Sequence, residues 1–149
     1  MFDLLKVPIL GNEEDAADQF STYLMLRLGS DQARRLILGA AYYFRRHIQN
    51  ESVTTHLKTF SDAHSRPPQR FYNLLCMAYG ANPTMFAELV TKDYLPKQRA
   101  MGCPREYRRV GNSFQTLIGP HIDRRLARKL QKRWLPPITA KPKTWRSTD

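Results

Sequence analysis

Residues 11–29, GNEEDAADQFSTYLMLRLG, contain the pattern that decides the fold class. Asn12 belongs to a residue type favoured at helix N-caps, and acidic residues follow it at once. Carboxylates in a first turn suit the partial positive charge at a helix N-terminus. Gly29 marks the end of the periodic stretch. The segment therefore predicts a helix from Glu13 to about Leu28.

Similar start and stop signals recur along the chain. Ser30 predicts the start of a second helix, which places its apolar residues on one stripe and continues to about Ile48. Glycine and proline separate the further helices that we expect: Thr55–Ala63 (short), Gln69–Tyr79, Thr84–Lys92, Pro104 to the Gly119-Pro120 pair, and Asp123 to about Trp134. No strand alternation or repeat is apparent. We expect an all-α, irregular multi-helix single domain over residues 1–136 and a basic, disordered tail over residues 137–149.

Basic charge is concentrated in the C-terminal third of the 149-residue chain. From Pro96 onward there are 14 lysines and arginines against 3 acids, whereas residues 1–95 hold 10 of each. Such a basic flank can contact nucleic acid, an anionic membrane surface or an acidic partner, or it can form a solvated face. No stretch approaches the roughly 18 apolar residues of a membrane span. Residues 1–10 do not resemble a signal peptide.

The sharpest chemical feature is the acidic run over residues 13–18. Glu14 and Asp18 are four residues apart and therefore face the same side of a helix. No basic residue lies three or four positions from Glu14. The two like charges repel one another unless a metal ion or an arginine from elsewhere in the chain lies between them. A simple role in stabilising the helix N-terminus is a third interpretation.

Five stretches match one known family in order: LKVPILGNEEDAADQ at 5–19, QRFYNLLC at 69–76, AYG at 78–80, LP at 95–96 and GPHID at 119–123. Together they resemble a family of bacterial zinc metallopeptidases, similar to gluzincins, that is catalogued as a domain of unknown function. The resemblance implies the C-terminal helical part of a metallopeptidase-like fold. It also implies peptide-bond hydrolysis by a zinc-activated water in the complete domain, and an exported or periplasmic location.

The resemblance also implies roles for the acidic run. In that family a His-Glu-x-x-His helix lies just before the equivalent of residues 1–5, and a Glu-x-x-x-Asp pattern on a following helix supplies the third zinc ligand. By resemblance, Glu14 is that ligand and Asp18 accepts a hydrogen bond from one of the histidines. Glu13 is the fallback ligand if the register differs by one residue.

The sequence departs from the family pattern at one decisive point, because it contains no His-Glu-x-x-His motif. We therefore expect this chain to be an N-terminally incomplete domain that binds no zinc and does not hydrolyse its peptide or protein substrate alone. The coding sequence just upstream of Met1 would distinguish a misplaced start from a true loss. The alternative function is a non-catalytic binding module that uses the basic helix after residue 123 for nucleic acid or an acidic partner.

Several other residues are candidates for a role. His64, and Tyr72 as the next choice, could stabilise an oxyanion, although a solvated or hydrogen-bonded loop histidine is the alternative. Arg70 and Asn73 could be structural, bonding loop carbonyls or a buried carboxylate. Two cysteines fit either one disulfide or two buried thiols, and the family resemblance suggests that Cys76 pairs with Cys103.

The absence of the His-Glu-x-x-His helix also predicts an uncovered apolar surface near the N-terminus. Without that helix, the apolar side chains Phe2, Leu4 and Leu5 lose a partner. We expect residues 1–12 to be poorly packed and the acidic run to line an open groove. We also expect the chain to self-associate through the uncovered N-terminal face, because exposed apolar patches favour association.

Overall fold

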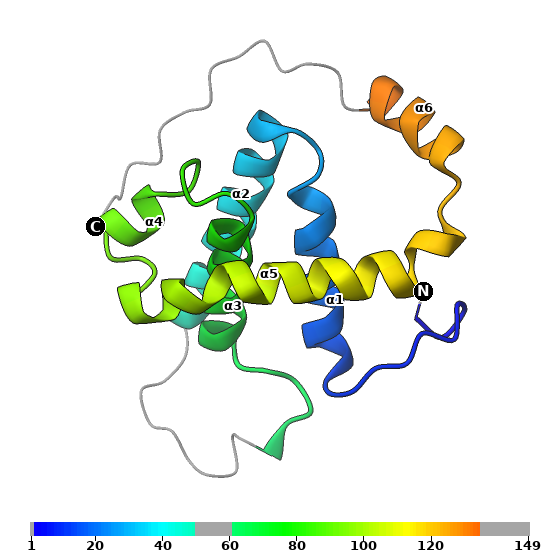
Figure 1. Cartoon of the computed structure of the whole chain (residues 1–149). Helices are drawn as coiled ribbons and strands as arrows, with labels where there is room; N and C mark the ends of the chain where they lie inside the picture. Colours follow the sequence, from blue (N-terminus) through cyan, green and yellow to red (C-terminus); the bar gives the residue numbers. More distant parts are fainter. Residues whose placement is uncertain (1, 50–60, 135–149) are drawn as a thin grey trace.

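The computed structural model describes residues 2–49 and 61–134, which form an all-α single domain without a strand in either range. Its elements are α1 (Glu13–Met25), α2 (Ser30–Gln49), α3 (Pro67–Ala81), α4 (Glu88–Thr91), α5 (Lys97–Leu117), the 3-10 turn η2 (Gly119–His121) and α6 (Arg124–Trp134) (Figure 1). The fold class expected from the sequence is confirmed.

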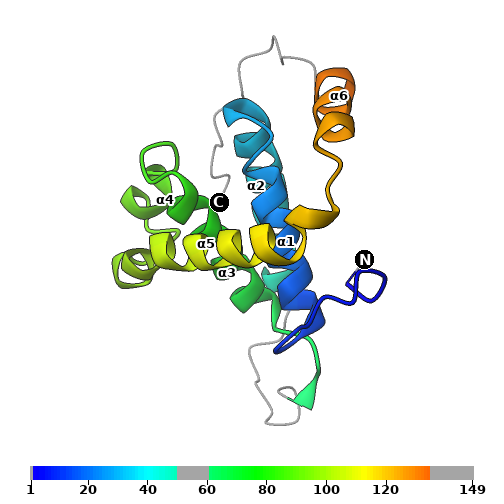
Figure 2. The same ribbon diagram turned by 45° about the vertical axis from the view of Figure 1, so that its right-hand side comes forward.

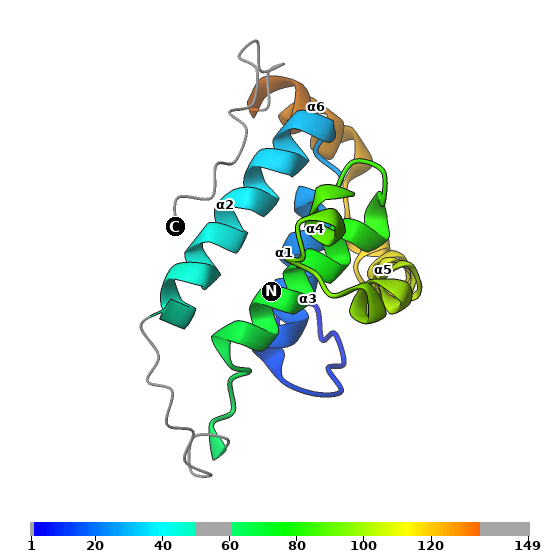
Figure 3. The ribbon, with the colours of Figure 1, turned by 90° about the vertical axis from the view of Figure 1, so that its left-hand side faces the viewer.

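α3 is the central helix of the domain. It begins at Pro67-Pro68, where the fixed φ and the missing N–H of proline suit a first helical turn. Residues 74–78 are all buried. Because five consecutive helical residues point in all directions around the axis, this part of α3 must be covered on every side. α1, α2 and α5 supply that cover (Figures 1 and 3).

At Gly80 the backbones of α3 and α5 are in direct contact. A Cβ atom on Gly80 would lie 2.3 Å from the carbonyl oxygen of Cys103 and 2.9 Å from the Cβ atom of Tyr107, so only glycine allows this approach. One turn earlier, Cys76 forms a disulfide with Cys103, and their Cα atoms are 5.0 Å apart. This distance lies inside the range of about 4.4–6.8 Å that is usual for disulfides, and the pairing agrees with the one that the family resemblance suggests.

α5 corrects one prediction, because Pro104 lies inside the helix and does not begin it. An internal proline removes a main-chain hydrogen bond and costs roughly 3 kcal/mol. Arg99 and Glu106 lie on either side of Pro104 and form a two-bond ion pair, with Nη1–Oε1 and Nη2–Oε2 distances of 2.6 and 2.8 Å. This pair spans Pro104 and links the two halves of α5, while the disulfide ties the adjacent Cys103 to α3.

Two further helices are shorter than predicted. α1 ends at Met25, before the expected Leu28, and Gly29 then turns the chain toward α2 with a φ of +97°. The helix expected over Thr84–Lys92 is reduced to α4, which follows a run of turns. There Arg34 of α2 donates to the carbonyl oxygen of Met85 at 3.0 Å and pairs with Glu88, and these bonds stabilise the turns. The helix expected over 55–63 falls largely outside the described residues.

The segment before α1 is attached to the domain through its first described residue. Phe2 is buried, and its ring meets that of Phe20 edge-on with centroids 6.0 Å apart. Phe20 in turn stacks on Phe114 of α5 at 5.5 Å. Leu4 and Leu10 are 85% and 103% exposed. Leu5 and Val7 also pack against the neighbouring apolar cluster. The expectation of a poorly packed N-terminal segment is therefore wrong for Phe2 and Leu5 and right for Leu4.

α6 stands apart from the other helices (Figures 1 and 2). Asp123 caps it, because its Oδ1 accepts hydrogen bonds from the N–H groups of Arg125 and Leu126 at 2.8 and 2.9 Å. Its predicted limits are close to those observed. Across residues 2–49 and 61–134, no helix has the length and apolar character needed to cross a membrane. The predicted tail over 137–149 lies outside the described residues.

Candidate functional site: the acidic head of the first helix

The first turn of α1 presents the acidic run beside the start of α3. Asn12 is the N-cap residue, as the sequence predicts, but its side chain makes no capping hydrogen bond. Its carbonyl oxygen accepts the first helical bond from the N–H of Ala16 at 3.2 Å. The helix therefore starts without a capping side chain, and the acidic residues of the first turn supply the favourable charge.

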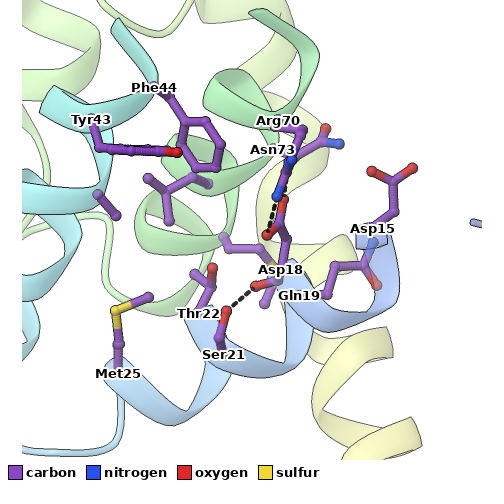
Figure 4. Close-up of a pocket in the computed structure, with 13 residues that line it drawn as sticks. Asp15, Asp18, Gln19, Ser21, Thr22, Met25, Tyr43, Phe44, Arg70 and Asn73 are labelled. Atoms are coloured by element: carbon purple, nitrogen blue, oxygen red, sulfur yellow. Dashed lines mark hydrogen bonds and ion pairs between the residues drawn. The ribbon is translucent and has the colours of Figure 1, made fainter. Parts of the chain in front are cut away.

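An arginine of α3 lies between the two carboxylates. Arg70 Nε and Nη2 donate to the two oxygens of Asp18 at 2.6 and 2.9 Å (Figure 4). Its Nη1 donates to Glu14 Oε2 at 3.2 Å. The bidentate bond to Asp18 is the strongest geometry available to a guanidinium and a carboxylate. Of the alternatives left open by the sequence, the structure contains the arginine, which relieves the repulsion between Glu14 and Asp18.

The surroundings of Arg70 favour its charged form. The hydrogen bond to Asp18 and the nearby carboxylates raise the pKa of Arg70, and partial burial opposes them. The guanidinium carbon also lies 5.1 Å from the centre of the Phe44 ring, a favourable cation–π distance. Arg70 is thus held between α1 and an aromatic residue of α2, so one side chain connects three helices.

The loop before α3 adds two contacts to the same acidic turn. His64 Nδ1 lies 2.9 Å from Glu14 Oε1, and Ser65 Oγ donates to Asp15 Oδ2 at 2.7 Å. The other oxygen of Asp15 is buried and has no hydrogen-bond partner among the described residues. Residues 50 positions apart in sequence are therefore brought together here.

A cavity of about 360 Å³ opens beside Arg70. The polar side chains of Asp18, Arg70 and Asn73 lie at one side of it, and the apolar side is formed by α1, α2 and α3, including Met25, Tyr43, Phe44 and Met77 (Figure 4). An apolar wall with a few polar groups at one side is typical of a small ligand or peptide side-chain site.

The structure separates the residues predicted for the site into two groups. Glu14, Asp18 and His64 come together around Arg70. Glu13 is exposed at the start of α1, and Tyr72 is 40% exposed, with its ring against that of Phe71 at 5.4 Å. Tyr72 is not among the residues that line the cavity.

The described residues do not fit a zinc ion by themselves. A catalytic zinc usually takes three protein ligands and a water, and no group of three histidine, cysteine, aspartate or glutamate side chains in the described part of the chain could hold a metal ion. The guanidinium of Arg70 bonds to the carboxylate that would act as a ligand. A cation on Glu14 would have to displace this bond or share the oxygens.

The geometry thus defines a helical domain with a neutralised acidic pair beside a half-apolar cavity. The chain belongs to the family described as "Putative metallopeptidase", whose model matches residues 1–118. This confirms the family expected from the sequence motifs. No curated protein and no solved structure matches the chain.

Sequence reasoning missed the cavity's aromatic side. Tyr43 and Phe44 lie on α2, and neither belongs to a stretch that carries the family resemblance. The sequence did contain an indication of this side of the cavity. Phe44 falls on the apolar stripe of the second helix, and Arg70 falls within the stretch 69–76 that resembles the family. Their pairing across the α2–α3 contact needed the fold.

Proposed function

We propose that this chain supplies the third-ligand helix and a cavity wall of a metallopeptidase domain, and that it does not hydrolyse peptide bonds by itself. The observation that carries this is the family match over residues 1–118 combined with a sequence that holds no His-Glu-x-x-His motif. The Glu14-x-x-x-Asp18 pattern stands at the head of α1, where a second segment could approach it.

The contacts of Arg70 support Glu14 as the ligand rather than Asp18. Both oxygens of Asp18 accept short bonds from Arg70, whereas Arg70 donates a single bond of 3.2 Å to Glu14. The other oxygen of Glu14 lies 2.9 Å from His64 Nδ1. Glu14 is 40% exposed and Asp18 29% exposed at the side chain. The carboxylate that the family resemblance assigns to zinc is therefore the more exposed of the two and the one less tightly bonded to Arg70. In this arrangement Asp18 positions Arg70.

His64 is the better candidate for oxyanion stabilisation in the complete domain. Its Nδ1 lies 2.9 Å from Glu14, so a donor on this imidazole would stand beside a group bound at Glu14. Tyr72 lies outside the cavity lining and would have to change its orientation to serve the same role.

Zinc content tests the proposal. Purified chain, dialysed against micromolar zinc and then against buffer, is expected to hold no stoichiometric zinc by elemental analysis, and Glu14→Gln is expected to change nothing. The matched control is Glu13→Gln, which tests the fallback ligand. About one tightly held zinc per chain, lost in Glu14→Gln and kept in Glu13→Gln, would overturn the proposal and place a working site in this chain.

Peptidase activity is the second measurement. With zinc added, the chain is expected to release no fluorescence from a quenched peptide library above the buffer rate. Zinc-dependent cleavage that disappears in Glu14→Gln would contradict the proposal.

The disulfide gives the expected export some support. Disulfides persist in oxidising compartments and are rare in the cytosol, and the only two cysteines of the chain are joined. We propose on this ground that the chain folds outside the cytosol.

A second candidate function rests on a different observation. Residues 124–129 are all exposed, and four of them are basic. Binding of nucleic acid or an acidic partner through α6, as expected from composition, remains a proposal separate from peptidase chemistry.

A further inference from the structure

We infer that α6 is a docking helix for the anionic surface of a lipid bilayer. Its described part, residues 124–129, holds Arg124, Arg125, Arg128 and Lys129, all exposed, and Leu126 is 50% exposed. α6 begins after the family match, which ends at residue 118. The inference therefore does not rest on the peptidase proposal.

The order of residues in α6 separates charge from apolar character. At 100° per residue, the basic residues of the described part, Arg124, Arg125, Arg128 and Lys129, fall within one arc of about 140°. Leu126 and Ala127 fall on the other side of the helix. A basic face opposite an apolar face is the pattern of helices that lie in the interface plane of a bilayer.

The fold leaves both faces of the described part available. α6 stands apart from the helices that cover α3 (Figures 1 and 2), and Asp123 fixes its start independently of the domain. Within the described part of α6, the rest of the domain leaves Leu126 half exposed, so this apolar side chain is available to a partner.

Charge decides which occupant fits best. The segment from Pro96 onward carries 14 basic and 3 acidic residues, and each lysine or arginine near an anionic membrane contributes roughly 1 kcal/mol to binding. Nucleic acid would match the charge but would leave the apolar face in water. A nucleic-acid partner is also at odds with the disulfide, since disulfides are characteristic of oxidising compartments outside the cytosol and nucleus. A flat anionic bilayer satisfies both halves of the helix.

The test is co-sedimentation of the full chain with vesicles of phosphatidylcholine alone and of phosphatidylcholine with phosphatidylglycerol at 3:1. We expect binding to the anionic vesicles only, weakened by 0.5 M NaCl because salt screens surface charge. Both tryptophans, Trp134 and Trp145, lie at or beyond the end of α6, so a blue shift of tryptophan fluorescence on binding reports entry of this region into the interface.

Two variants of α6, each with a matched control elsewhere in the chain, distinguish the contributions of its basic and apolar faces to vesicle affinity from a general effect of net charge. The double variant Arg124→Gln/Arg128→Gln is expected to lower vesicle affinity about 30-fold, and Leu126→Gln about tenfold. The controls are Arg105→Gln/Arg108→Gln, which removes the same charge from exposed positions of α5, and Leu4→Gln, which replaces another exposed leucine. Both controls are expected to change affinity less than threefold. Far-UV circular dichroism verifies that each variant is folded.

Three outcomes would overturn the inference. Absence of binding to anionic vesicles removes it. Equal losses of vesicle affinity in the α5 and α6 charge variants, with no effect of Leu126→Gln, would show that the chain is attracted to the vesicles only by its net charge. Binding of a DNA or RNA oligonucleotide, or a concentration-dependent dimer lost in Leu126→Gln, in the absence of vesicle binding, would assign α6 to nucleic acid or to a second copy of the chain.

Discussion

α3 is held in two different ways at its two ends. At its C-terminal end, Gly80 and the disulfide fix it against α5 through contacts that leave no room for another atom. At its N-terminal end, Arg70 fixes it against α1 through charges that remain about a quarter exposed. Close packing tolerates almost no change, whereas partly hydrated ion pairs contribute modestly and depend on salt. The predictions below test this difference.

Removal of the disulfide should have the largest effect. It closes a loop with a sequence separation of 27 residues, for which chain entropy predicts a contribution of about 3.5 kcal/mol. Cys76→Ser/Cys103→Ser should lower the free energy of unfolding by this amount in urea titrations. A reductant should do the same to the parent chain and nothing to the double variant. An unchanged urea midpoint would mean that the α3–α5 contact is held without the bond.

Gly80→Ala should have the next largest effect, lowering the free energy of unfolding by about 2–3 kcal/mol because the added methyl group overpacks the contact between α3 and α5. The atoms that a Cβ would meet include backbone carbonyl atoms, which cannot move aside as a side chain can. Gly39→Ala is the matched control, because nothing lies within 4 Å of its added Cβ. There the substitution should stabilise α2 by about 0.5–1 kcal/mol. Similar losses at both positions would contradict the crossing described here.

Arg70→Met should lower the free energy of unfolding by less, about 1–2 kcal/mol. The substitution leaves two partly exposed carboxylates facing each other. The loss should shrink in 1 M NaCl. A group with a raised pKa contributes stability that is lost only as pH rises through that value, so the contribution of Arg70 should persist throughout the neutral and moderately alkaline range. Arg105→Met, at an exposed position of α5, should change stability by less than about 0.5 kcal/mol.

Asp123→Ala should have the smallest global effect. It removes the cap of α6 and destabilises that helix by about 1 kcal/mol. Because α6 stands apart from the core, the urea midpoint should not move, while amide hydrogen exchange over residues 124–129 should accelerate. A shifted midpoint would show that α6 is part of the cooperative unit.

The helical class and most helix positions followed from local signals, because caps, glycines and prolines act within a few residues. Pro104 misled the prediction for the opposite reason. An ion pair within α5 spans it, and a disulfide ties the adjacent Cys103 to α3. The second of these contacts joins distant residues and is not visible in a window of neighbouring residues. Phe2 was expected to be uncovered because the aromatic partners in α1 and α5 meet only in the fold.

The same limit applied to the candidate site. Glu14 and Asp18 were found from a four-residue spacing, which is local. Arg70, which lies between them, is 52 residues away from Asp18. The sequence alone therefore left both a metal ion and an arginine as possible partners of the two carboxylates. The positions of His64 and Tyr72 relative to Glu14 also depended on how the loop before α3 packs.

The bond between Cys76 and Cys103 has a consequence for chain continuity. It encloses the turns after α3, α4 and the start of α5 in a covalent ring. A single proteolytic cut between these two cysteines therefore leaves one molecule, which separates into two fragments only after reduction. A protease site inserted near Asp93, where the backbone already has a positive φ of 57°, would open the ring without releasing either half. The crossing of α3 and α5 could then be studied as a two-chain assembly held by one bond.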